Sequence, residues 1–263
     1  MMLQNSIRSI MSKCDSYVIC TSPRSGSTLL CKLLARTSVA GNPDSYFHRP
    51  SISAWLEDLD LTPEPSMSER DVLATVFQAA IAEGSLETGM FGLRLQRDSF
   101  DFFTEKLAVL HPGLSSDVER FHAAFGRTSF VYLMRQDKVE QAISLVKAQQ
   151  TGLWHRAPDG TELERLAPPQ EPNYDGDELR SQFNRLTSNE RNWERWFETE
   201  NIKPLRITYE GLSEDPMETL YRVLEHLGLD ASAANGVIPD VAKLADDTSR
   251  DWAARFRSEH NVA

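Results

Sequence analysis

Residues 16–30 read SYVICTSPRSGSTLL, a stretch that places a small polar turn between two apolar segments. Residues 17–20 form a short apolar run typical of a buried strand, and residues 29–34 begin an apolar pattern typical of a helix. The turn between them contains a single charged residue, Arg24. The stretch therefore predicts a strand, a tight loop and a helix that starts at the loop.

The composition of this loop indicates an anion-binding site. The first N–H groups of a helix have no intrahelical partner and carry partial positive charge, so they attract anions. Gly26 allows the backbone to approach a ligand closely, and the guanidinium of Arg24 fits tetrahedral oxyanions. The hydroxyl groups of Ser25, Ser27 and Thr28 add hydrogen-bond donors. The alternative is an ordinary strand-to-helix turn capped by a serine or threonine.

The loop resembles the phosphate loop of nucleotide-binding proteins without matching the Walker A motif. That motif consists of a glycine, four further residues, and then Gly-Lys-Ser or Gly-Lys-Thr. In this chain the upstream glycine is absent and the cation, Arg24, precedes Gly26. No acidic pair follows a predicted strand in the Walker B manner, which fits an anion site without a metal.

The overall composition limits the classes of protein to consider. The chain has 263 residues, of which 40% are apolar, enough for a substantial core. A net charge of −11 argues against general affinity for nucleic acid or for an anionic membrane, so an anion site must be a local cluster of cations. The sequence has no apolar run of about 18 residues, and its N-terminus lacks the apolar core of a signal peptide. We therefore expect a cytoplasmic protein without a membrane span.

The cysteines and histidines indicate neither a disulfide framework nor a metal site. Of the three cysteines, Cys20 and Cys31 fall in the predicted strand and helix, where we expect them in the core. The odd number and the spacing argue against disulfides, and no Cys-x-x-Cys pair or Cys/His cluster suggests zinc. The six histidines also lack the spacing of metal ligands. We predict no metal-binding residue.

Apolar strands alternate with amphipathic helices along the rest of the chain. Further strands are predicted at residues 89–96, 128–135 and 204–212. Helices are predicted at residues 31–40, 71–84, 101–111, 138–154, 177–201 and 216–229, and irregular loops at 41–58 and 155–177. This alternation predicts an α/β fold, a P-loop-like parallel sheet flanked by helices. We expect one domain, with a core at about residues 17–230 and a helical C-terminal tail at 231–263.

Two cationic positions follow predicted strands. The polar loop with Arg24 comes after the first strand, and Arg135 ends the strand at 128–135. Ligands of parallel α/β sheets bind outside the carboxyl ends of the strands. We therefore expect both arginines to converge on one crevice.

An ordered set of motifs adds to this pattern. The motifs are SPRSGST at 22–28, GNPDSYF at 41–47, GLR at 92–94, LMRQDKVEQAIS at 133–144, QTGLW at 150–154, ITYEGL at 207–212 and DP at 215–216. In this order they resemble the Stf0 family of bacterial carbohydrate sulfotransferases, whose type member sulfates trehalose. The resemblance covers about residues 17–229, and the block at 135–144 is its most specific part.

The resemblance implies a sulfotransferase fold and a defined chemistry. The donor would be 3′-phosphoadenosine 5′-phosphosulfate (PAPS), and the acceptor a hydroxyl of a carbohydrate or glycoconjugate, with no metal and with a homodimeric assembly. The residues implied to bind PAPS are Pro23, Arg24, Ser25, Gly26, Ser27 and Thr28 at the 5′ phosphosulfate, and Arg135 and Ser144 at the 3′-phosphate. Arg24 would also stabilise charge during transfer. The alternatives are a surface ion pair of Arg135 with Asp137 or Glu140, and an ordinary helical role for Ser144.

The general base is where this chain departs from the family pattern. The family places a glutamate directly before the paired aromatics, and here that position is Ser45. A serine hydroxyl is not a base near neutral pH. The neighbouring Asp44 and His48 are the candidates for this catalytic role, and His155 is a more distant one.

The acceptor site is expected on the loop at residues 42–55. The candidate residues are Asn42, Asp44, Ser45, Tyr46, Phe47, His48 and Trp55. The aromatic rings could stack on sugar rings, or they could anchor the loop in the core. Pro23 stands where trehalose-specific relatives carry a glutamine, and proline has no side-chain donor, which leaves the acceptor open.

Two further clusters favour structural roles. Trp193, Trp196 and Phe197 form a helical stripe that indicates core packing, with a subunit interface as the alternative. Near the C-terminus lie Arg250, Trp252, Arg255 and Arg257. We interpret them as a solvated terminal helix, with a cover over the nucleotide as the alternative.

Two other functions compete with sulfotransfer. A nucleotide kinase or NTPase with a variant phosphate loop would require Mg²⁺, and the absent Walker lysine argues against it. A non-catalytic PAPS-binding protein is favoured only by Ser45 in place of the family glutamate.

Overall fold

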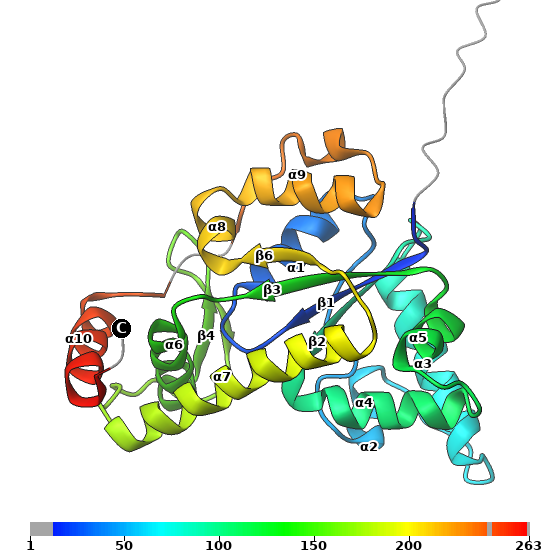
Figure 1. Cartoon of the computed structure of the whole chain (residues 1–263), viewed down its shortest axis with the longest axis horizontal. Helices are drawn as coiled ribbons and strands as arrows, with labels where there is room; N and C mark the ends of the chain where they lie inside the picture. Colours follow the sequence, from blue (N-terminus) through cyan, green and yellow to red (C-terminus); the bar gives the residue numbers. More distant parts are fainter. Residues whose placement is uncertain (1–12, 241–243, 262–263) are drawn as a thin grey trace, which may run out of the picture.

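The central sheet of the chain consists of four parallel strands in the order β2-β1-β3-β6 (Figure 1). The computed structural model describes residues 13–240 and 244–261. The strands of the sheet are β1 Ser16–Thr21, β2 Phe91–Gln96, β3 Thr128–Met134 and β6 Leu205–Thr208. The α/β class with a helix-flanked parallel sheet is confirmed.

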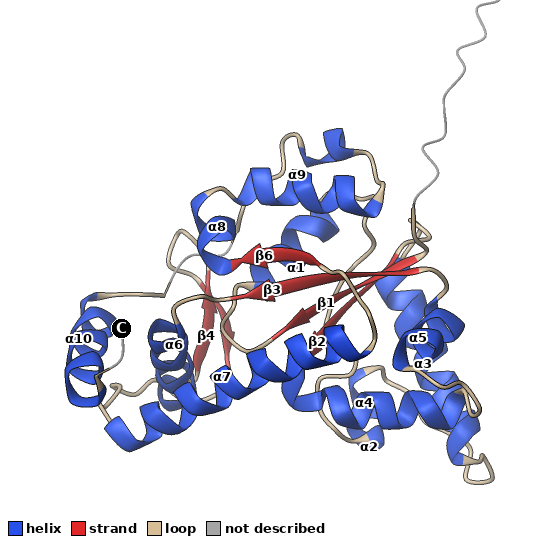
Figure 2. Cartoon of the chain, in the orientation of Figure 1, coloured by secondary structure: helices blue, strands red, loops and turns tan. Residues whose placement is uncertain are grey.

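The side chains of β1 alternate between two cores on opposite faces of the sheet. Tyr17 and Ile19 belong to one apolar cluster, and Val18 and Cys20 belong to the other. Successive side chains of a strand point to opposite faces, so helices must cover both (Figure 2). This double burial explains why β1 reads as a continuous apolar run.

Each face of the sheet has its own set of helices. The cluster around Tyr17 and Ile19 is completed by α1 Ser27–Arg36 and α9 Pro216–Leu227. The aromatic-rich cluster around Val18 is completed by α3 Glu69–Ser85, α4 Arg97–Leu110, α5 Asp117–Phe125 and α7 Gly176–Thr199. The remaining elements are α2 Ile52–Asp58, α6 Lys138–Thr151, α8 Tyr209–Glu214, η1 Ala231–Ala234 and α10 Asp247–His260.

The predicted loop at 155–177 contains a hairpin that the sequence analysis missed. β4 Leu153–Arg156 pairs antiparallel with β5 Glu162–Arg165. The preceding helix, predicted to reach residue 154, ends at Thr151 because Gly152 adopts φ 70° and caps it. A side chain at Gly152 would also come within 2.6 Å of the Ala167 backbone nitrogen.

Three other differences follow from local capping. The helix α5, which the sequence analysis missed, begins with a capping box between Ser116 and Glu119. The strand predicted at 204–212 stops at Thr208, whose side chain accepts a hydrogen bond from the Gly211 N–H and starts α8. The helix α2 lies inside the loop predicted at 41–58, with Ser51 as its N-cap.

Several expectations from the sequence concern segments that the structure describes only in part. The predicted helical tail contains η1 and α10, while residues 241–243 and 262–263 lie outside the described part. The segment judged to lack a signal peptide falls largely in residues 1–12, also outside it. None of the described helices combines the length and apolar composition that crossing a membrane requires. Cys20 and Cys31 are buried, as predicted for core residues.

Candidate functional site

The polar loop between β1 and α1 adopts a conformation that restricts its residues. Gly26 is the N-cap of α1 with φ 84°, and Arg24 also has a positive φ, of 63°. A Cβ atom at Gly26 would lie 2.8 Å from a ring carbon of Tyr209, closer than packing allows. A positive φ is unusual for arginine and is found where surrounding structure holds the backbone. The loop is therefore a tight turn in which Gly26 cannot be replaced without displacement.

The side chain of Arg24 connects the loop to two other elements. Its Nε donates to Ser144 Oγ of α6 at 2.9 Å, and its Nη1 donates to the Trp154 carbonyl of β4 at 2.7 Å. Burial, together with the nearby charge of Arg135, lowers the pKa of Arg24 to about 10. The guanidinium remains charged at neutral pH, so it is a partly buried cation that a bound anion would stabilise.

Arg135 is a second cation, next to Arg24, and it is buried. Arg135 follows β3 and is 8% exposed, and its guanidinium lies 4.4 Å from the ring centre of Tyr209. Its Nη1 donates to the Arg24 carbonyl at 3.5 Å, and its Nη2 lies 3.9 Å from Glu140, a long ion pair. Asp137, the other acid considered, pairs with a different arginine. Among the described residues, no acceptor forms a hydrogen bond with the Nε–H of Arg135.

Arg94 is a cation of this site that the sequence analysis quoted in a motif but gave no role. It lies on β2 and donates to three groups: Ser45 Oγ at 2.6 Å, Thr28 Oγ1 at 2.9 Å and Asp44 Oδ1 at 3.0 Å. It therefore joins the loop before α1 to the predicted acceptor segment. The signal was present in the sequence, because a charged residue inside an otherwise apolar strand needs a partner at the strand end.

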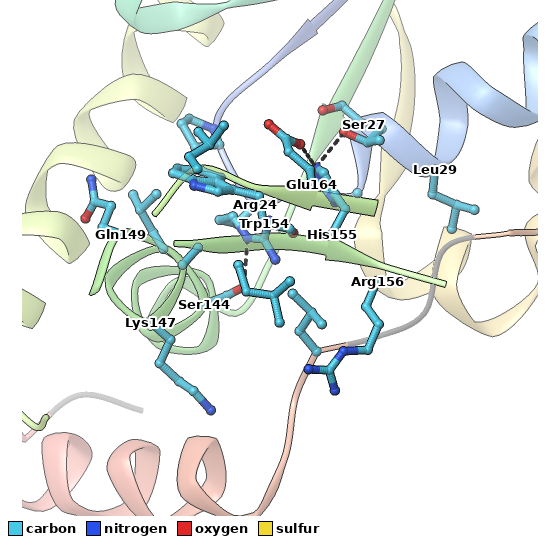
Figure 3. A pocket seen from close by; sticks show the side chains of 18 of the residues that line it. Arg24, Ser27, Leu29, Ser144, Lys147, Gln149, Trp154, His155, Arg156 and Glu164 are labelled. Atoms are coloured by element: carbon cyan, nitrogen blue, oxygen red, sulfur yellow. Dashed lines mark hydrogen bonds and ion pairs between the residues drawn. The ribbon is translucent and has the colours of Figure 1, made fainter. Parts of the chain in front are cut away.

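Most of the predicted site residues line one cavity of about 950 Å³. This volume lies within the range of small-molecule sites. The predicted residues that line it are Pro23, Arg24, Gly26, Ser27, Thr28, Asp44, Ser45, Tyr46, His48, Arg135 and Ser144. Figure 3 shows Arg24 and Ser144 together with Trp154 and His155 of the hairpin. The expected convergence of the loop and Arg135 is present.

Phe47 and Trp55 were expected at the acceptor site, and the structure contradicts this. Both are fully buried, and their rings pack edge to face with centres 5.0 Å apart. Phe47 also packs against Phe77 and Phe103 in the aromatic core. These rings therefore anchor the segment and have no face for a ligand.

Ser25 and Asn42 also lie outside the lining of the cavity. The Ser25 hydroxyl is buried, donates to the Ser22 carbonyl at 2.9 Å and shares a short hydrogen bond with Thr21 Oγ1. Asn42 is occupied with Tyr46, whose hydroxyl donates to the Asn42 carbonyl at 2.6 Å. The side chains of Ser25 and Asn42 thus fix loop conformations and do not offer free groups to a ligand.

The two residues expected to act as base both border the cavity. Asp44 Oδ1 accepts from Arg94 and from the Ser45 N–H at 2.7 Å, and its side chain is 62% exposed. The pKa of His48 is lowered, mainly by burial of its ring and then by the charge of Arg94. Asp44 is therefore already engaged by two donors, while His48 is neutral.

The hairpin contributes a further titratable pair to the same cavity. His155 Nε2 lies 3.1 Å from Thr28 Oγ1 and 3.3 Å from Glu164 Oε2 (Figure 3). Burial, followed by the charges of Arg24, Arg94 and Lys32, lowers the pKa of His155 to about 4. No sequence signal pointed to Glu164, because the segment that contains it was interpreted as irregular.

Of the two clusters interpreted as structural, the tryptophan stripe is found in the core, while the C-terminal helix is solvated on one side only, because Trp252 is buried. The tryptophan stripe of α7 lies in the core, with Trp193 fully buried and its Nε1 donating to the Thr21 carbonyl at 2.8 Å. In α10, Trp252 packs with Val139 and Ile143 of α6. Each of the three arginines of the C-terminal cluster pairs with an acid: Arg250 with Asp247, Arg255 with Glu259 and Arg257 with Asp137.

Comparison with known families agrees with the family that the motifs indicated. A sequence model of the family described as "Stf0 sulphotransferase" matches residues 16–259. A "Trehalose 2-sulfotransferase" of Mycolicibacterium smegmatis is 27% identical over 270 residues, covering 93% of this chain and 95% of that protein. A protein of the same description from Mycobacterium tuberculosis is 26% identical over 261 residues, covering 92% and 94%. The solved sulfotransferase domain of the Synechococcus PCC 7002 olefin synthase aligns with a TM-score of 0.43 and 16% identity, over 92% of this chain and 86% of that one.

Proposed function

The chain belongs to the Stf0 sulfotransferase family, and we propose that it transfers a sulfuryl group from PAPS to a hydroxyl of a carbohydrate or glycoconjugate. Family membership makes it a sulfotransferase. The donor, the acceptor class and the roles of individual residues are the parts that we propose.

The observation that carries the donor assignment is the pair of arginines that follow β1 and β3, Arg24 partly buried and Arg135 buried. Arg24 and Arg135 both line the cavity, and no carboxylate of the described residues lies closer than the long contact of Arg135 with Glu140. Two neighbouring cations repel each other, so an anionic group beside each of them would stabilise the arrangement. PAPS has such groups at both ends. In the proposal, the loop at residues 23–28 holds the 5′ phosphosulfate through its backbone and the side chains of Arg24, Ser27 and Thr28, while Ser25 fixes the loop, and Arg135 and Ser144 hold the 3′-phosphate.

The chemistry asked of these residues is positioning and charge stabilisation. In-line transfer of a sulfuryl group resembles phosphoryl transfer in its geometry. The N-terminus of α1 and the guanidinium of Arg24 stabilise negative charge that develops on the leaving phosphate. A sulfuryl group carries less charge than a phosphoryl group, so an arginine can serve where kinases use Mg²⁺.

The acceptor side of the cavity is formed by the segment at residues 44–48. Asp44, Ser45, Tyr46 and His48 line it and offer polar groups of the kind that recognise sugar hydroxyls. The names of the two relatives, both trehalose 2-sulfotransferases, support a carbohydrate acceptor. Asp44 and His48 are the candidate bases on this side.

A homodimer is part of the proposal, on the analogy of the family. The stripe of Trp193, Trp196 and Phe197 cannot form its interface, because these side chains fill the core. Light scattering of the purified protein would test the assembly, and a mass of one chain at micromolar concentration would contradict it.

The decisive experiment is calorimetric titration of the protein with adenosine 3′,5′-bisphosphate in the absence of metal. We expect tight binding, and we expect ATP with Mg²⁺ to bind much more weakly. The reverse preference would favour a kinase or NTPase, and no binding of the bisphosphate by a folded sample would remove the donor assignment. Turnover of PAPS then separates an enzyme from a protein that only binds the donor.

A further inference from the structure

We propose that His155, supported by Glu164, is the base that removes the proton from the acceptor hydroxyl. This inference rests on the proposed function, since it assigns a role within the same cavity. It differs from the expectation for Asp44 and His48, because it assigns proton removal to the β4–β5 hairpin.

The position of the imidazole is the first support. Nε2 of His155 lies 3.1 Å from Thr28 Oγ1, in the first turn of α1, where the proposed phosphosulfate site is located. Arg94 donates to that same oxygen at 2.9 Å, so the Thr28 hydroxyl directs its own proton toward Nε2. Thr28 therefore shows that a hydroxyl can donate to this nitrogen from the side of the loop.

Glu164 is placed to stabilise the imidazole once it is charged. Its Oε2 lies 3.3 Å from Nε2, and both residues line the cavity. When Nε2 accepts a proton it becomes a donor, and the carboxylate is within reach to accept from it. The carboxylate contacts the same nitrogen that takes the proton, so it stabilises the imidazolium and does not orient the neutral ring.

The protonation state of His155 at neutral pH supports the same role. The charged groups facing it are Arg24 of the loop, Arg94 of β2, Lys32 of α1 and Glu164 of β5. Burial and the three cations keep its pKa below the ordinary value, so the imidazole is neutral, and the Nε2 lone pair that now faces the Thr28 hydroxyl can accept a proton once an acceptor hydroxyl takes that place. The same cations favour an anionic donor, which would offset their effect on the imidazolium.

Asp44 and Ser45 are less well placed to take a proton. Asp44 Oδ1 already accepts from Arg94 and from the Ser45 N–H, and the Ser45 hydroxyl accepts from Arg94. His155 is instead held next to the donor site, because Arg24 donates to the carbonyl of Trp154, the preceding residue. One arginine thereby fixes the loop and the strand that carries the base.

The proposed sulfuryl transfer needs no group other than the acceptor, the donor, His155 and Glu164. The acceptor oxygen attacks sulfur as its proton passes to Nε2 of His155, and an O–S bond forms. The bond between sulfur and the bridging oxygen of the donor breaks, and its electron pair leaves with adenosine 3′,5′-bisphosphate. The imidazolium, paired with Glu164, then releases its proton to solvent.

The test compares His155→Gln and Glu164→Gln with wild type, using PAPS as donor and trehalose, glucose and water as acceptors. We expect His155→Gln to lower kcat by about 100-fold or more, the usual share of general-base catalysis. The affinity for adenosine 3′,5′-bisphosphate and the KM for PAPS should stay at the wild-type values. The wild-type kcat should fall as pH drops toward the pKa of His155, and this acidic limb should be absent in His155→Gln. Glu164→Gln should lower kcat less and move the limb to lower pH.

Two matched variants control for the loss of a histidine and for the loss of an acid from the hairpin. His122→Gln changes a histidine of α5 that does not line the cavity, and Glu162→Gln changes the other acid of β5. Both should keep the wild-type kcat.

Three outcomes would overturn the inference. The first is full turnover in His155→Gln. The second is a loss of bisphosphate affinity in His155→Gln that is as large as its loss of turnover. The third is a wild-type protein that binds the bisphosphate but transfers no sulfuryl group even to water. Failure of the wild type to bind the bisphosphate would instead overturn the proposed function, and this inference with it.

Discussion

The cavity has two walls that are built in different ways. One wall, the sheet wall, consists of the β1–α1 loop with Arg94 and Arg135, and its side chains come from or follow buried parallel strands. The other, the hairpin wall, consists of β4 and β5, whose pairing has register shifts and whose Leu163 is 41% exposed. The hairpin contacts the sheet wall through Arg24 to the Trp154 carbonyl and through His155 to Thr28. The comparison indicates that the sheet wall fixes the charges and also positions the hairpin.

Trp193→Ala should have the largest effect, because it removes a support behind the sheet wall. The side chain is fully buried and donates to the Thr21 carbonyl at the end of β1. We expect the free energy of unfolding to fall by about 3–5 kcal/mol, measured by denaturant titration. Leu163→Ala on the hairpin is the control, with an expected change within about 0.5 kcal/mol. Equal losses in the two variants would remove the distinction between the walls.

Arg24→Ala should have the next largest effect, and it acts on both walls. It removes a cation of the donor site and the hydrogen bonds to Ser144 and to the Trp154 carbonyl. We expect binding of adenosine 3′,5′-bisphosphate to weaken by about 1.5–3 kcal/mol, the scale of charged hydrogen bonds. Faster amide exchange at residues 153–156 would show that the hairpin has loosened. Arg36→Ala, at the far end of α1, should change neither, and unchanged affinity in Arg24→Ala would exclude our view of the site.

The pH dependence of stability tests the contribution of His155, on the hairpin wall. The native pKa of His155, about 4, lies below its ordinary value near 6.5, so between these values the unfolded chain binds the proton and the native protein does not. The protein should therefore lose stability as pH falls through this window, by at most about 1.4 kcal/mol per pH unit from this residue. His48, His111 and His226 have the same sign of shift, so the readout is the difference between wild type and His155→Gln. Parallel Tm curves from pH 7 to pH 4 would show that His155 does not contribute.

Ser144→Ala should have the smallest effect. Its hydroxyl accepts from Arg24 Nε at 2.9 Å, while Arg24 keeps its bond to the Trp154 carbonyl. We expect bisphosphate binding to weaken by about 0.5–1.5 kcal/mol, the range of a single hydrogen bond. Thr187→Ala on α7, a hydroxyl bonded only to its own helix, is the calorimetric control. A loss as large as that of Arg24→Ala would mean that Ser144 contributes more than one bond.

The predictable parts of the site are those in which the residues that form a feature are close together in the sequence. The strand, turn and helix at residues 16–36 are read directly from an apolar run, a glycine and a second apolar run. Arg135 was predictable for the same reason, since it follows a buried strand and strand ends converge in a parallel sheet. Phe47 and Trp55 were not, because an aromatic residue in a loop has the same local pattern whether it meets a ligand or the core.

The sequence by itself determined the parallel sheet, the polar turn between a buried strand and a helix, the two arginines that follow strands and the family of the chain, because these depend on residue type and on short-range periodicity. Only the tertiary structure decided that Arg94 joins Thr28 to Asp44, that Ser25 faces away from the cavity and that His155 meets Glu164 beside the loop. Arg94 is 66 residues from Thr28 and 50 from Asp44 along the chain, and Thr28 is 127 residues from His155. Contacts of that kind depend on how the hairpin packs against the sheet, and no local pattern encodes that packing.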